Sequence, residues 1–447
     1  MQYDRRKFLS ESLTAVGAFG VLNSNLGKTI IESSKIRAPA PYRGAMAIMQ
    51  GLTSTSSAEF IMVTESKKNY GYQVVSSDGT VTLPVRITRR ETRSTSNWGI
   101  EKTYVSGLAL SKSYLLRIID PVSGKAIDER NFTALDTESP RGKYVVASCM
   151  KDSSDSLREV MWDAVNNSNP QLVILAGDTC YADNEGNDGS DADYWRRYIE
   201  SRTLLSHFRQ KKLIPTLATW DDHDFGGNNF DSSWEKKDMT KELFEIFWHN
   251  EVPSPLLQKG PGVAQVFSAF GQRFFMMDDR TWRSPREGVS KPVQWGEAQE
   301  EFLFEKITEN NRPAMLINGS QFFGGYLKKD AFEYWQADNL KSICSQLALV
   351  EAPVVFVGGD VHFSEFMNIE PEILGYPTIE ITSSSIHSTT IPFNHLRKKN
   401  KRRIDATSAH NFVLIDSSTQ SAGWSLKAQS LGKDLKEYMN ETFLIQR

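Results

Sequence analysis

From Tyr144 onward, the sequence repeats one pattern in which a short apolar run is followed by polar residues and then by a helical stretch. Runs of this kind are typical of buried strands in a parallel sheet, and their alternation with helices predicts a layered α/β domain. One run, Leu172–Leu175, leads through Ala176 and Gly177 to Asp178. Open α/β sheets bind ligands at the carboxyl ends of their strands, so Asp178 stands where a site is expected. A single Gly-Asp pair after a strand is usually a turn, so this interpretation depends on partners elsewhere in the chain.

Other apolar runs also end in side chains that can bind metal. Together with Asp178, the residues at these strand ends are Cys149, Tyr181, Asp222, His223, Asp360 and His362. A single cysteine next to a strand is by default a core residue, but the repeated strand-end placement favours a thiolate ligand for Cys149. Cys180 lies between two residues that point to the site, so we expect it to point away into the core. In an extended backbone, Asp360 and His362 would point to the same side and could reach one metal ion.

The ordered set of motifs resembles the calcineurin-like metallophosphatases, with consistent departures from their general pattern. A cysteine stands at the first position, a tyrosine replaces the second aspartate, and aspartates replace the asparagine before the catalytic histidine and the first histidine of the last pair: Cys149, Tyr181, Asp222 and Asp360. These departures resemble those of the PhoD-like alkaline phosphatase/phosphodiesterase family, and the resemblance spans about residues 42 to 425. Further stretches similar to blocks of that family are Phe275–Arg280, Trp295–Gln299, Asn318–Gln321 and Ile379–Ile386.

The predicted fold class is α/β, with a β module ahead of the main domain. The resemblance implies a four-layer α/β/β/α metallophosphatase sandwich as the catalytic domain over residues 138–447. Residues 41–137 alternate in polarity and carry turn residues, which predicts an immunoglobulin-like or fibronectin-like β-sandwich. Near the carboxyl terminus we expect closing strands from Asn411 to about Leu426, and a short helix or cap over Asp434–Met439.

Two local patterns support the β module. Ser77-Asp78-Gly79 between two strand-like runs indicates a hairpin turn. Gly107-Leu108, a few residues before Tyr114, is typical of the tyrosine corner of β-sandwich domains. This segment has no cluster of histidine, cysteine or acidic residues with ligand spacing, so we expect it to carry no chemistry.

The amino terminus resembles a twin-arginine export signal. Arg5-Arg6-Lys7-Phe8-Leu9 matches the motif, and the mildly apolar stretch Leu13–Leu22 is too short for a permanent membrane helix. The alternative is a basic start to a soluble helix. The export interpretation assigns residues 1–40 to a signal and linker, makes the twin-arginine machinery a partner, and predicts a periplasmic or extracellular location. Export of an already folded protein would suit a metal loaded in the cytoplasm.

The strand-end residues predict a two-metal centre with Asp178 as the bridging carboxylate. The first site would be completed by Cys149, Tyr181 and His362, and the second would use Asp222 and Asp360. Thiolate and phenolate ligands favour Fe(III) at the first site, whereas oxygen ligands suit Ca²⁺, Mn²⁺ or Mg²⁺ at the second. The pairing of iron with calcium is implied by the family resemblance and not by the spacing.

Three residues are candidates for catalysis and substrate binding, and a fourth could reach the site. His223 is the expected general acid, because neighbouring carboxylates should raise its pKa and keep it protonated near neutral pH. Arg280 and Asn229 are candidates for binding phosphoryl oxygens, with a surface ion pair and a loop cap as their alternatives. His387 follows a serine-rich loop at another strand end and could reach the site.

Composition limits the classes of partner. The net charge of −3 and the 39% hydrophobic content are those of an ordinary globular protein, which argues against a stable nucleic-acid partner. Three cysteines do not form a disulfide framework. We expect a monomeric, exported phosphoesterase that hydrolyses mono- or diesters by attack of a metal-bound hydroxide on a small phosphate ester, a phospholipid or a nucleotide. The alternative is a non-catalytic, metal- or ligand-binding protein of the cell envelope on the same fold.

Overall fold

The computed structural model describes residues 43–110, 112–152, 155–183, 187–324, 331–397, 400–420 and 423–447. Residues Tyr42–Arg447 group as one compact unit. The twin-arginine motif, the apolar stretch after it and the linker to residue 40 lie outside the described residues. No helix within the described ranges combines the length and the apolar character that a bilayer crossing needs.

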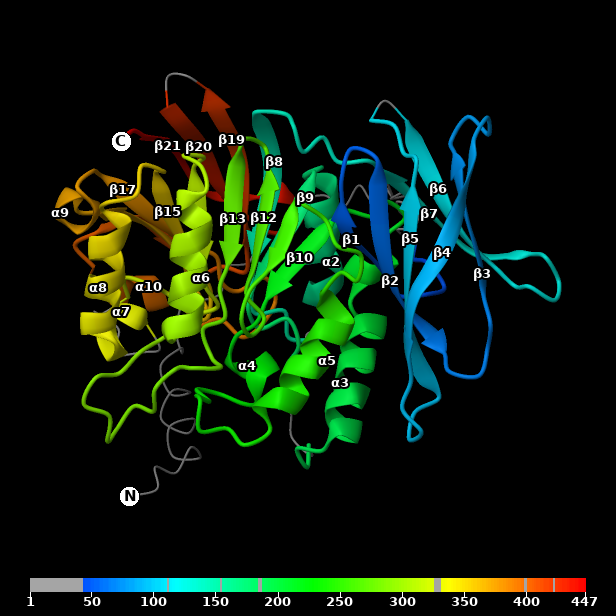
Figure 1. Cartoon of the computed structure of the whole chain (residues 1–447), viewed down its shortest axis with the longest axis horizontal. Coiled ribbons are helices and arrows are strands. Elements are labelled where there is room, and N and C mark those ends of the chain that lie inside the picture. Colours follow the sequence, from blue (N-terminus) through cyan, green and yellow to red (C-terminus); the bar gives the residue numbers. More distant parts are fainter. Residues whose placement is uncertain are drawn as a thin grey trace, which may run out of the picture. The chain divides into compact units, whose positions relative to one another are not determined.

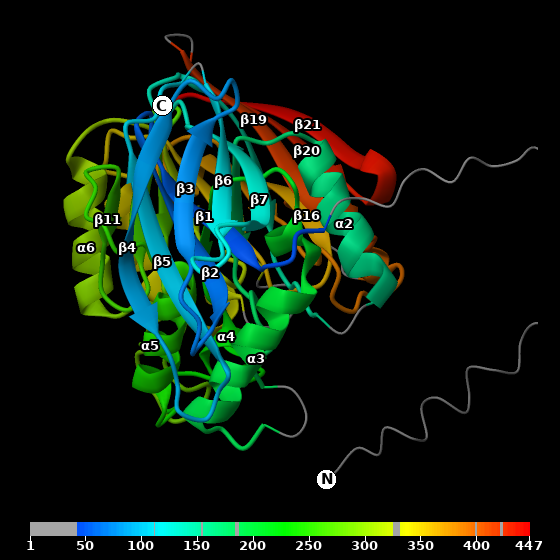
Figure 2. The same cartoon turned by 90° about the vertical axis from the view of Figure 1, so that its right-hand side faces the viewer.

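The first part of this unit is an antiparallel sheet, which Figure 2 shows nearly face on. Its described strands follow the order β1-β2-β5-β4-β3-β6-β7 and form a half-barrel or sandwich. They are β1 (Ile48–Thr53), β2 (Ser57–Glu65), β3 (Gly71–Ser76), β4 (Thr82–Glu91), β5 (Trp98–Ser106), β6 (Ser113–Ile119) and β7 (Ala126–Thr133). The predicted β module is therefore confirmed as an antiparallel unit.

Both local patterns of the β module are present. Gly79 lies between β3 and β4 with a φ of 71°, a conformation that glycine adopts without strain, and its amide donates to the Ser76 carbonyl oxygen over 2.8 Å. The hydroxyl of Tyr114 accepts a 2.8 Å hydrogen bond from the Ala109 amide, just upstream of β6. The buried Tyr114 ring thus has its polar end satisfied, as a tyrosine corner requires.

The rest of the chain is a mixed α/β unit with two sheets (Figure 1). In one, the order is β10-β9-β8-β19-β20-β21, and β8, β9 and β10 are parallel. In the other, the order is β11-β12-β13-β14-β15-β17-β16-β18, and β13, β14, β15 and β17 are parallel. The strands of the first sheet are β8 (Arg141–Ala147), β9 (Leu172–Ala176), β10 (Thr216–Thr219), β19 (Phe412–Gln420), β20 (Gly423–Leu431) and β21 (Glu437–Ile445). Those of the second are β11 (Leu257–Lys259), β12 (Gln265–Ala269), β13 (Gln272–Met276), β14 (Ala314–Ile317), β15 (Val354–Gly358), β16 (Ser364–Ile369), β17 (Thr378–Thr382) and β18 (Arg403–Thr407).

The apolar runs are continuous because both faces of the central strands are buried. In β8, Tyr144 and Val146 belong to a core shared with the second sheet, whereas Val145 and Ala147 belong to a core shared with helices. The core that contains Val145 and Ala147 is covered by the helices α2 (Asp155–Asn167), α3 (Asp191–Leu204) and α5 (Lys237–Trp248). The core between the two sheets also includes residues of the helices α6 (Glu297–Thr308) and α8 (Ala337–Leu347). Each fully buried large apolar side chain contributes about 1.5–3 kcal/mol, so this two-sided burial fixes the positions of the strand ends.

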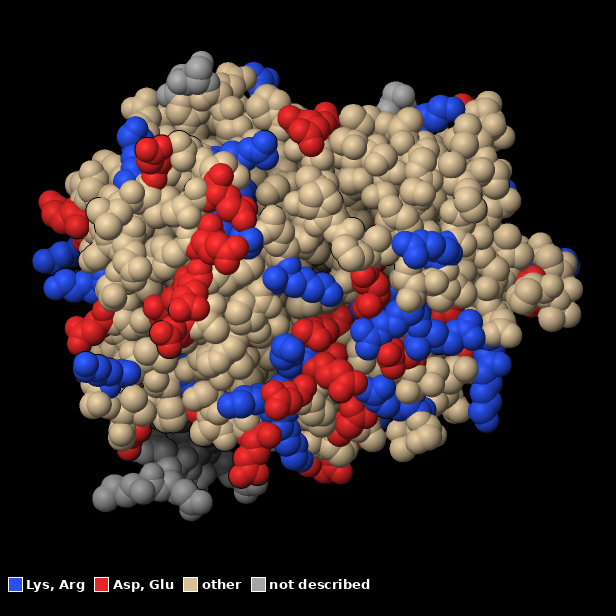
Figure 3. All heavy atoms as spheres, in the orientation of Figure 1, with Lys and Arg blue, Asp and Glu red and all other residues tan. Residues whose placement is uncertain are grey.

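A buried lysine joins the β module to the α/β part. The side chain of Lys102 on β5 is fully buried, and its ammonium donates to the carbonyl oxygens of Glu245 and His249 and to the Glu251 carboxylate over 2.7 to 3.0 Å. These bonds satisfy carbonyl groups at the carboxyl end of α5, where positive charge is favoured. Arg93 adds ion pairs to acidic residues of α3 and α5, and Figure 3 shows interleaved acidic and basic side chains on this face.

The carboxyl-terminal segment differs in part from the prediction. The closing strands expected from Asn411 are present as β19 and β20. The short helix or cap predicted over Asp434–Met439 is partly wrong, because a 3-10 turn ends at Leu435 and the strand β21 follows. Met439, Phe443 and Ile445 in β21 face the core and pair the segment with β20, so tertiary burial decides its conformation.

Two buried histidines predict a loss of stability in acid. Burial lowers the pKa of both His207 and His249 to about 3, from an ordinary value of 6.5. Between about pH 6.5 and pH 3, these histidines are therefore protonated in the unfolded chain and neutral in the folded protein. Above pH 6.5 they do not reduce the free energy of unfolding, and at pH 5 each of them lowers it by about 2 kcal/mol. Urea unfolding at pH 7.5 and pH 5 measures this loss. His207→Gln should retain more of its stability at pH 5, and an equal loss in both proteins would contradict the assignment.

Candidate metal centre

The polar residues predicted at the strand ends meet at one edge of the two sheets. Glycines permit the approach of these ends. A Cβ atom on Gly359 would lie 2.5 Å from the Ala176 carbonyl oxygen, and one on Gly177 would lie 2.9 Å from the Cα atom of Gly319. These separations are too short for any side chain, so the close contact between the end of β9 in one sheet and the ends of β14 and β15 in the other requires glycine.

Five of the predicted site residues have a left-handed backbone. The φ angles are 56° for Cys149, 52° for Asp178, 64° for Asn229, 65° for Asp360 and 58° for His362. The extended geometry expected for the pair at 360 and 362 is therefore wrong. Non-glycine residues rarely adopt this conformation, and it concentrates at functional sites where the surrounding structure holds it. The strand ends thus turn sharply and direct their side chains into a common space.

The first group of candidate ligands consists of Cys149, Asp178 and His362, whose donor atoms all lie within 4.8 Å of one another. Tyr181 is close by, because its hydroxyl donates to Asp178 Oδ2 over 3.1 Å. Asp178 is 1% exposed, and its Oδ1 atom has no hydrogen-bond partner. Burial raises the pKa of Asp178 well above its ordinary value, and it also raises the pKa of the neighbouring Cys149 thiol, to about 11. The predicted ligands of the first metal are therefore brought together.

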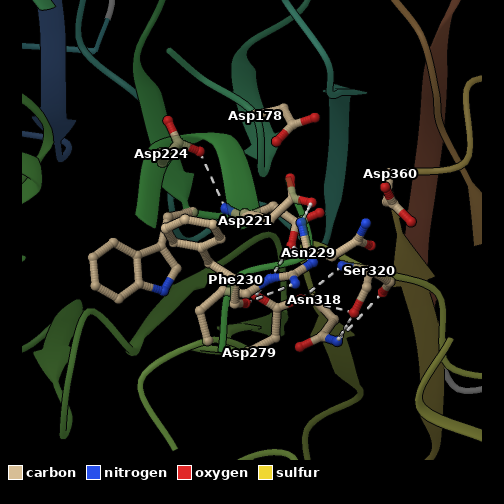
Figure 4. A network of polar contacts seen from close by, with 12 residues as sticks. Asp178, Asp221, Asp224, Asn229, Phe230, Asp279, Asn318, Ser320 and Asp360 are labelled. Carbon is tan, nitrogen blue, oxygen red and sulfur yellow. Dashed lines mark hydrogen bonds and ion pairs between the residues drawn. The ribbon is translucent and has the colours of Figure 1, made fainter. Parts of the chain in front are cut away.

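The second group shares Asp178 and adds Asp222 and His223, again within 4.8 Å. Asp222 Oδ2 accepts the Asn229 amide over 2.6 Å, whereas its Oδ1 atom has no partner. Neither group found among the described residues includes Asp360, whose backbone oxygen lies 3.9 Å from the Cys149 sulfur. Figure 4 shows Asp178, Asn229 and Asp360 gathered at the strand ends.

The donor atoms fit metal ions. A buried carboxylate oxygen without a hydrogen bond is costly, and the two groups contain one each on Asp178 and Asp222. A cation between these oxygens would remove that cost. The first group offers sulfur, carboxylate and imidazole donors, which suit a transition metal. The second is richer in oxygen, which also suits a harder cation. These groups are therefore possible buried metal-binding groups.

His223 is held by a carboxylate that the sequence analysis did not single out. Its Nδ1 atom lies 2.7 Å from Asp183 Oδ1, and its ring stacks on Tyr181 with centroids 4.1 Å apart. Burial alone would lower the pKa of His223, but the charges of Asp178, Asp183 and Asp222 outweigh burial and raise it to about 10. Asp183 lies two residues after Tyr181 in the same loop, which is the only clue that the sequence offered.

A capping network fixes the short helix α4 (Asp222–Phe225), which carries two of the site residues. Asp224 closes a capping box with Asp221 and also accepts hydrogen bonds from the Thr179 hydroxyl and the amides of Thr179 and Cys180. These hydrogen bonds connect the loop after β9 with the loop after β10. Figure 4 shows the contact of Asp224 with the backbone of Asp221. Cys180 points into the core as predicted, so its amide, and not its sulfur, serves the site.

The two predicted substrate-binding residues have partners within the protein. Arg280 is fully buried, and its Nε atom donates to Asp221 Oδ1 over 2.5 Å. This is an ion pair in the interior, unlike the surface pair considered from the sequence. The backbone N–H of Asn229 donates to Asp222 Oδ2, and its side-chain Oδ1 atom accepts a hydrogen bond from the Arg286 guanidinium over 2.6 Å. Arg280 therefore supports the loop that carries Asp222.

The loop after β17 contributes serines that the sequence analysis noted without assigning a role. The Ser388 hydroxyl lies 3.0 Å from the Tyr181 hydroxyl, and Ser384 lies beside Cys149. His387 in the same loop is buried, with one ring nitrogen 3.0 Å from the Trp162 indole and the other 2.9 Å from the Lys151 carbonyl oxygen. Both ring nitrogens of His387 are thus engaged within the protein, and burial lowers its pKa to about 3.

Comparison of the chain with protein-family models found no match, and comparison with curated proteins found none at a significant level. Any function assigned to the site therefore rests on its residues and their geometry.

Proposed function

We propose that this protein is an exported, metal-dependent phosphoesterase of the PhoD-like type, built on a four-layer α/β/β/α sandwich. The observation that carries the proposal is the unpartnered, buried carboxylate oxygen of Asp178 between two groups of donor atoms. A carboxylate shared by two such groups suits a bridging ligand. The strand-end motifs and their departures from the general metallophosphatase pattern support the same conclusion.

The residues that would hold the first ion are Cys149, Asp178, Tyr181 and His362, and those for the second are Asp178, Asp222 and Asp360. The anionic sulfur and phenol donors favour Fe(III) at the first position, and the carboxylates favour Ca²⁺, Mn²⁺ or Mg²⁺ at the second. When bound, the cations would neutralise phosphoryl oxygens and acidify a water molecule. The protein contributes a rigid frame, because the ligands come from strand ends that are fixed by burial on both faces.

His223 has the geometry of a general acid. Its Nδ1 atom is engaged by Asp183, which fixes the ring and leaves Nε2 as the nitrogen that can deliver a proton to a leaving oxygen. Stacking on Tyr181 further restricts the ring. In the metal-free protein, the carboxylates around the site raise the pKa of His223 to about 10, which favours the protonated imidazole at neutral pH. Asp183 is accordingly a positioning residue for the proton donor.

The test is a substrate panel run on protein of known metal content. The exported protein would be assayed on p-nitrophenyl phosphate, bis-p-nitrophenyl phosphate, a phospholipid and a nucleotide, before and after removal of metal by a chelator. We expect hydrolysis of at least one ester, its loss with the metal, and its return on reloading with iron and calcium. Bound metal without hydrolysis of any ester would instead favour a non-catalytic metal-binding protein of the cell envelope.

A further inference from the structure

The sulfur of Cys149 lies between two serine hydroxyls. Ser148 Oγ is 3.3 Å from the sulfur, and Ser384 Oγ is 3.1 Å from it. All three side chains are buried, with at most 1% of their surface exposed. Ser148 is the sequence neighbour of the cysteine, whereas Ser384 comes from the loop after β17, 235 residues away in the chain.

The two hydroxyls differ in where their protons go. Ser148 Oγ donates its proton to the Ser383 carbonyl oxygen over 2.7 Å, so towards the sulfur it presents lone pairs. Ser384 Oγ accepts the backbone amide of His362 over 2.9 Å, and its own proton can point to the Cys149 sulfur, 3.1 Å away. A thiolate sulfur can only accept, so towards a thiolate Ser384 can be the donor and Ser148, whose one proton goes to Ser383, cannot.

We propose that Ser384 is a positioning residue that donates a hydrogen bond to the Cys149 thiolate and thereby tunes the bond between this sulfur and the first metal ion. The inference rests on the proposed metal site. Through the same oxygen, Ser384 also binds the backbone of His362, so one side chain connects two candidate ligands from different sheets.

The expected chemical effect follows from charge. A hydrogen bond to a thiolate withdraws electron density from the sulfur, so the sulfur donates less charge to the metal. Charge transfer from sulfur to metal then requires more energy. Loss of the Ser384 proton should shift this absorption to longer wavelength, and for a bound iron it should make the reduction potential more negative. A purely structural serine would change the folding stability and leave the absorption where it is.

Cobalt titration of the metal-free, full-length protein tests the inference without an activity assay. Co²⁺ bound to a thiolate absorbs in the near ultraviolet, and Cys149→Ser identifies this band by removing it. In Ser384→Ala we expect the band at longer wavelength and a Co²⁺ dissociation constant raised by about tenfold or more, as for other groups that orient metal ligands. Ser148→Ala is the matched control, and its band should stay at the wild-type wavelength. Thermal unfolding of each variant reports whether it folds.

Ser384→Thr retains the hydroxyl and should restore the wild-type band, which keeps the test decisive if the alanine variant folds poorly. If Ser384→Ala absorbed at the wild-type wavelength and bound Co²⁺ with wild-type affinity, the role of Ser384 would be overturned, and the assignment of Cys149 would stand. A shift in Ser148→Ala equal to that in Ser384→Ala would also overturn it. Absence of any thiolate band in the wild-type protein would overturn both this inference and the assignment of Cys149 to the metal site.

Discussion

Asp178→Asn is expected to abolish stoichiometric metal binding and ester hydrolysis, and yet to make the metal-free protein more stable. Asp178 belongs to both groups of donor atoms, so its loss should weaken the binding of both ions. Without metal, the ionised form of Asp178 is unfavourable, because burial raises its pKa. Asparagine keeps the size and removes the charge, so the free energy of unfolding of the metal-free protein should rise by about 1–3 kcal/mol.

The measurement combines elemental analysis, hydrolysis of bis-p-nitrophenyl phosphate and urea unfolding after chelation. Asp416→Asn, at an exposed position of β19, is the matched control and should leave all three unchanged. A carboxylate with a structural role would give the opposite stability change. If metal-free Asp178→Asn were less stable than the metal-free wild-type protein, or retained its metal, Asp178 would not be a bridging ligand.

His223→Gln is expected to reduce turnover by about 10²–10⁴-fold on esters with alkyl leaving groups, because these leaving oxygens need a proton. The loss should be smaller on p-nitrophenyl esters, whose leaving group departs as an anion. Asp183→Asn should give a weaker form of the same pattern, because it loosens the ring without removing it. Metal content should remain at the wild-type level in Asp183→Asn.

The ratio of turnover on an alkyl ester to turnover on a nitrophenyl ester, with metal content measured in parallel, separates proton donation from metal binding. His395→Gln is the control, because this histidine bonds Ser408 and belongs to neither group of donor atoms. An equal loss on both kinds of ester would mean that His223 acts mainly on the metal or on substrate binding.

Several features of the fold and site could be predicted because their signals are local. Each apolar run predicts a strand, and the polar residue that follows the run marks the end of that strand. Because the ends of parallel strands lie at one edge of a sheet, Cys149, Asp178 and His362 could be expected there. Their left-handed backbones could not, because those arise where strand ends turn against the neighbouring sheet. The roles of Asp183 and Ser384 escaped prediction for a related reason. Each acts by contacting a residue distant in sequence, and only the folded chain specifies that contact.

The surroundings of Arg280 could not be predicted from the sequence. The sequence left phosphoryl binding and a surface ion pair open for this residue, and the folded protein buries it and pairs it with Asp221. A buried ion pair can specify geometry without adding much stability, and here it supports the loop that presents Asp222. The tail differs for a similar reason, because the helix or cap expected there gives way to a strand that buries Phe443 against the core.

In the proposed centre, Asp178 would hold both cations at the ends of the strands. X-ray diffraction from crystals of the natively exported protein, recorded at the absorption edges of the metals found by elemental analysis, tests it most directly. We expect one anomalous peak within bonding distance of the Cys149 sulfur, Asp178 and His362, and a second within bonding distance of Asp178 and Asp222. An actively hydrolysing protein with no anomalous peak at Asp178, or with its metal bound elsewhere, would contradict it.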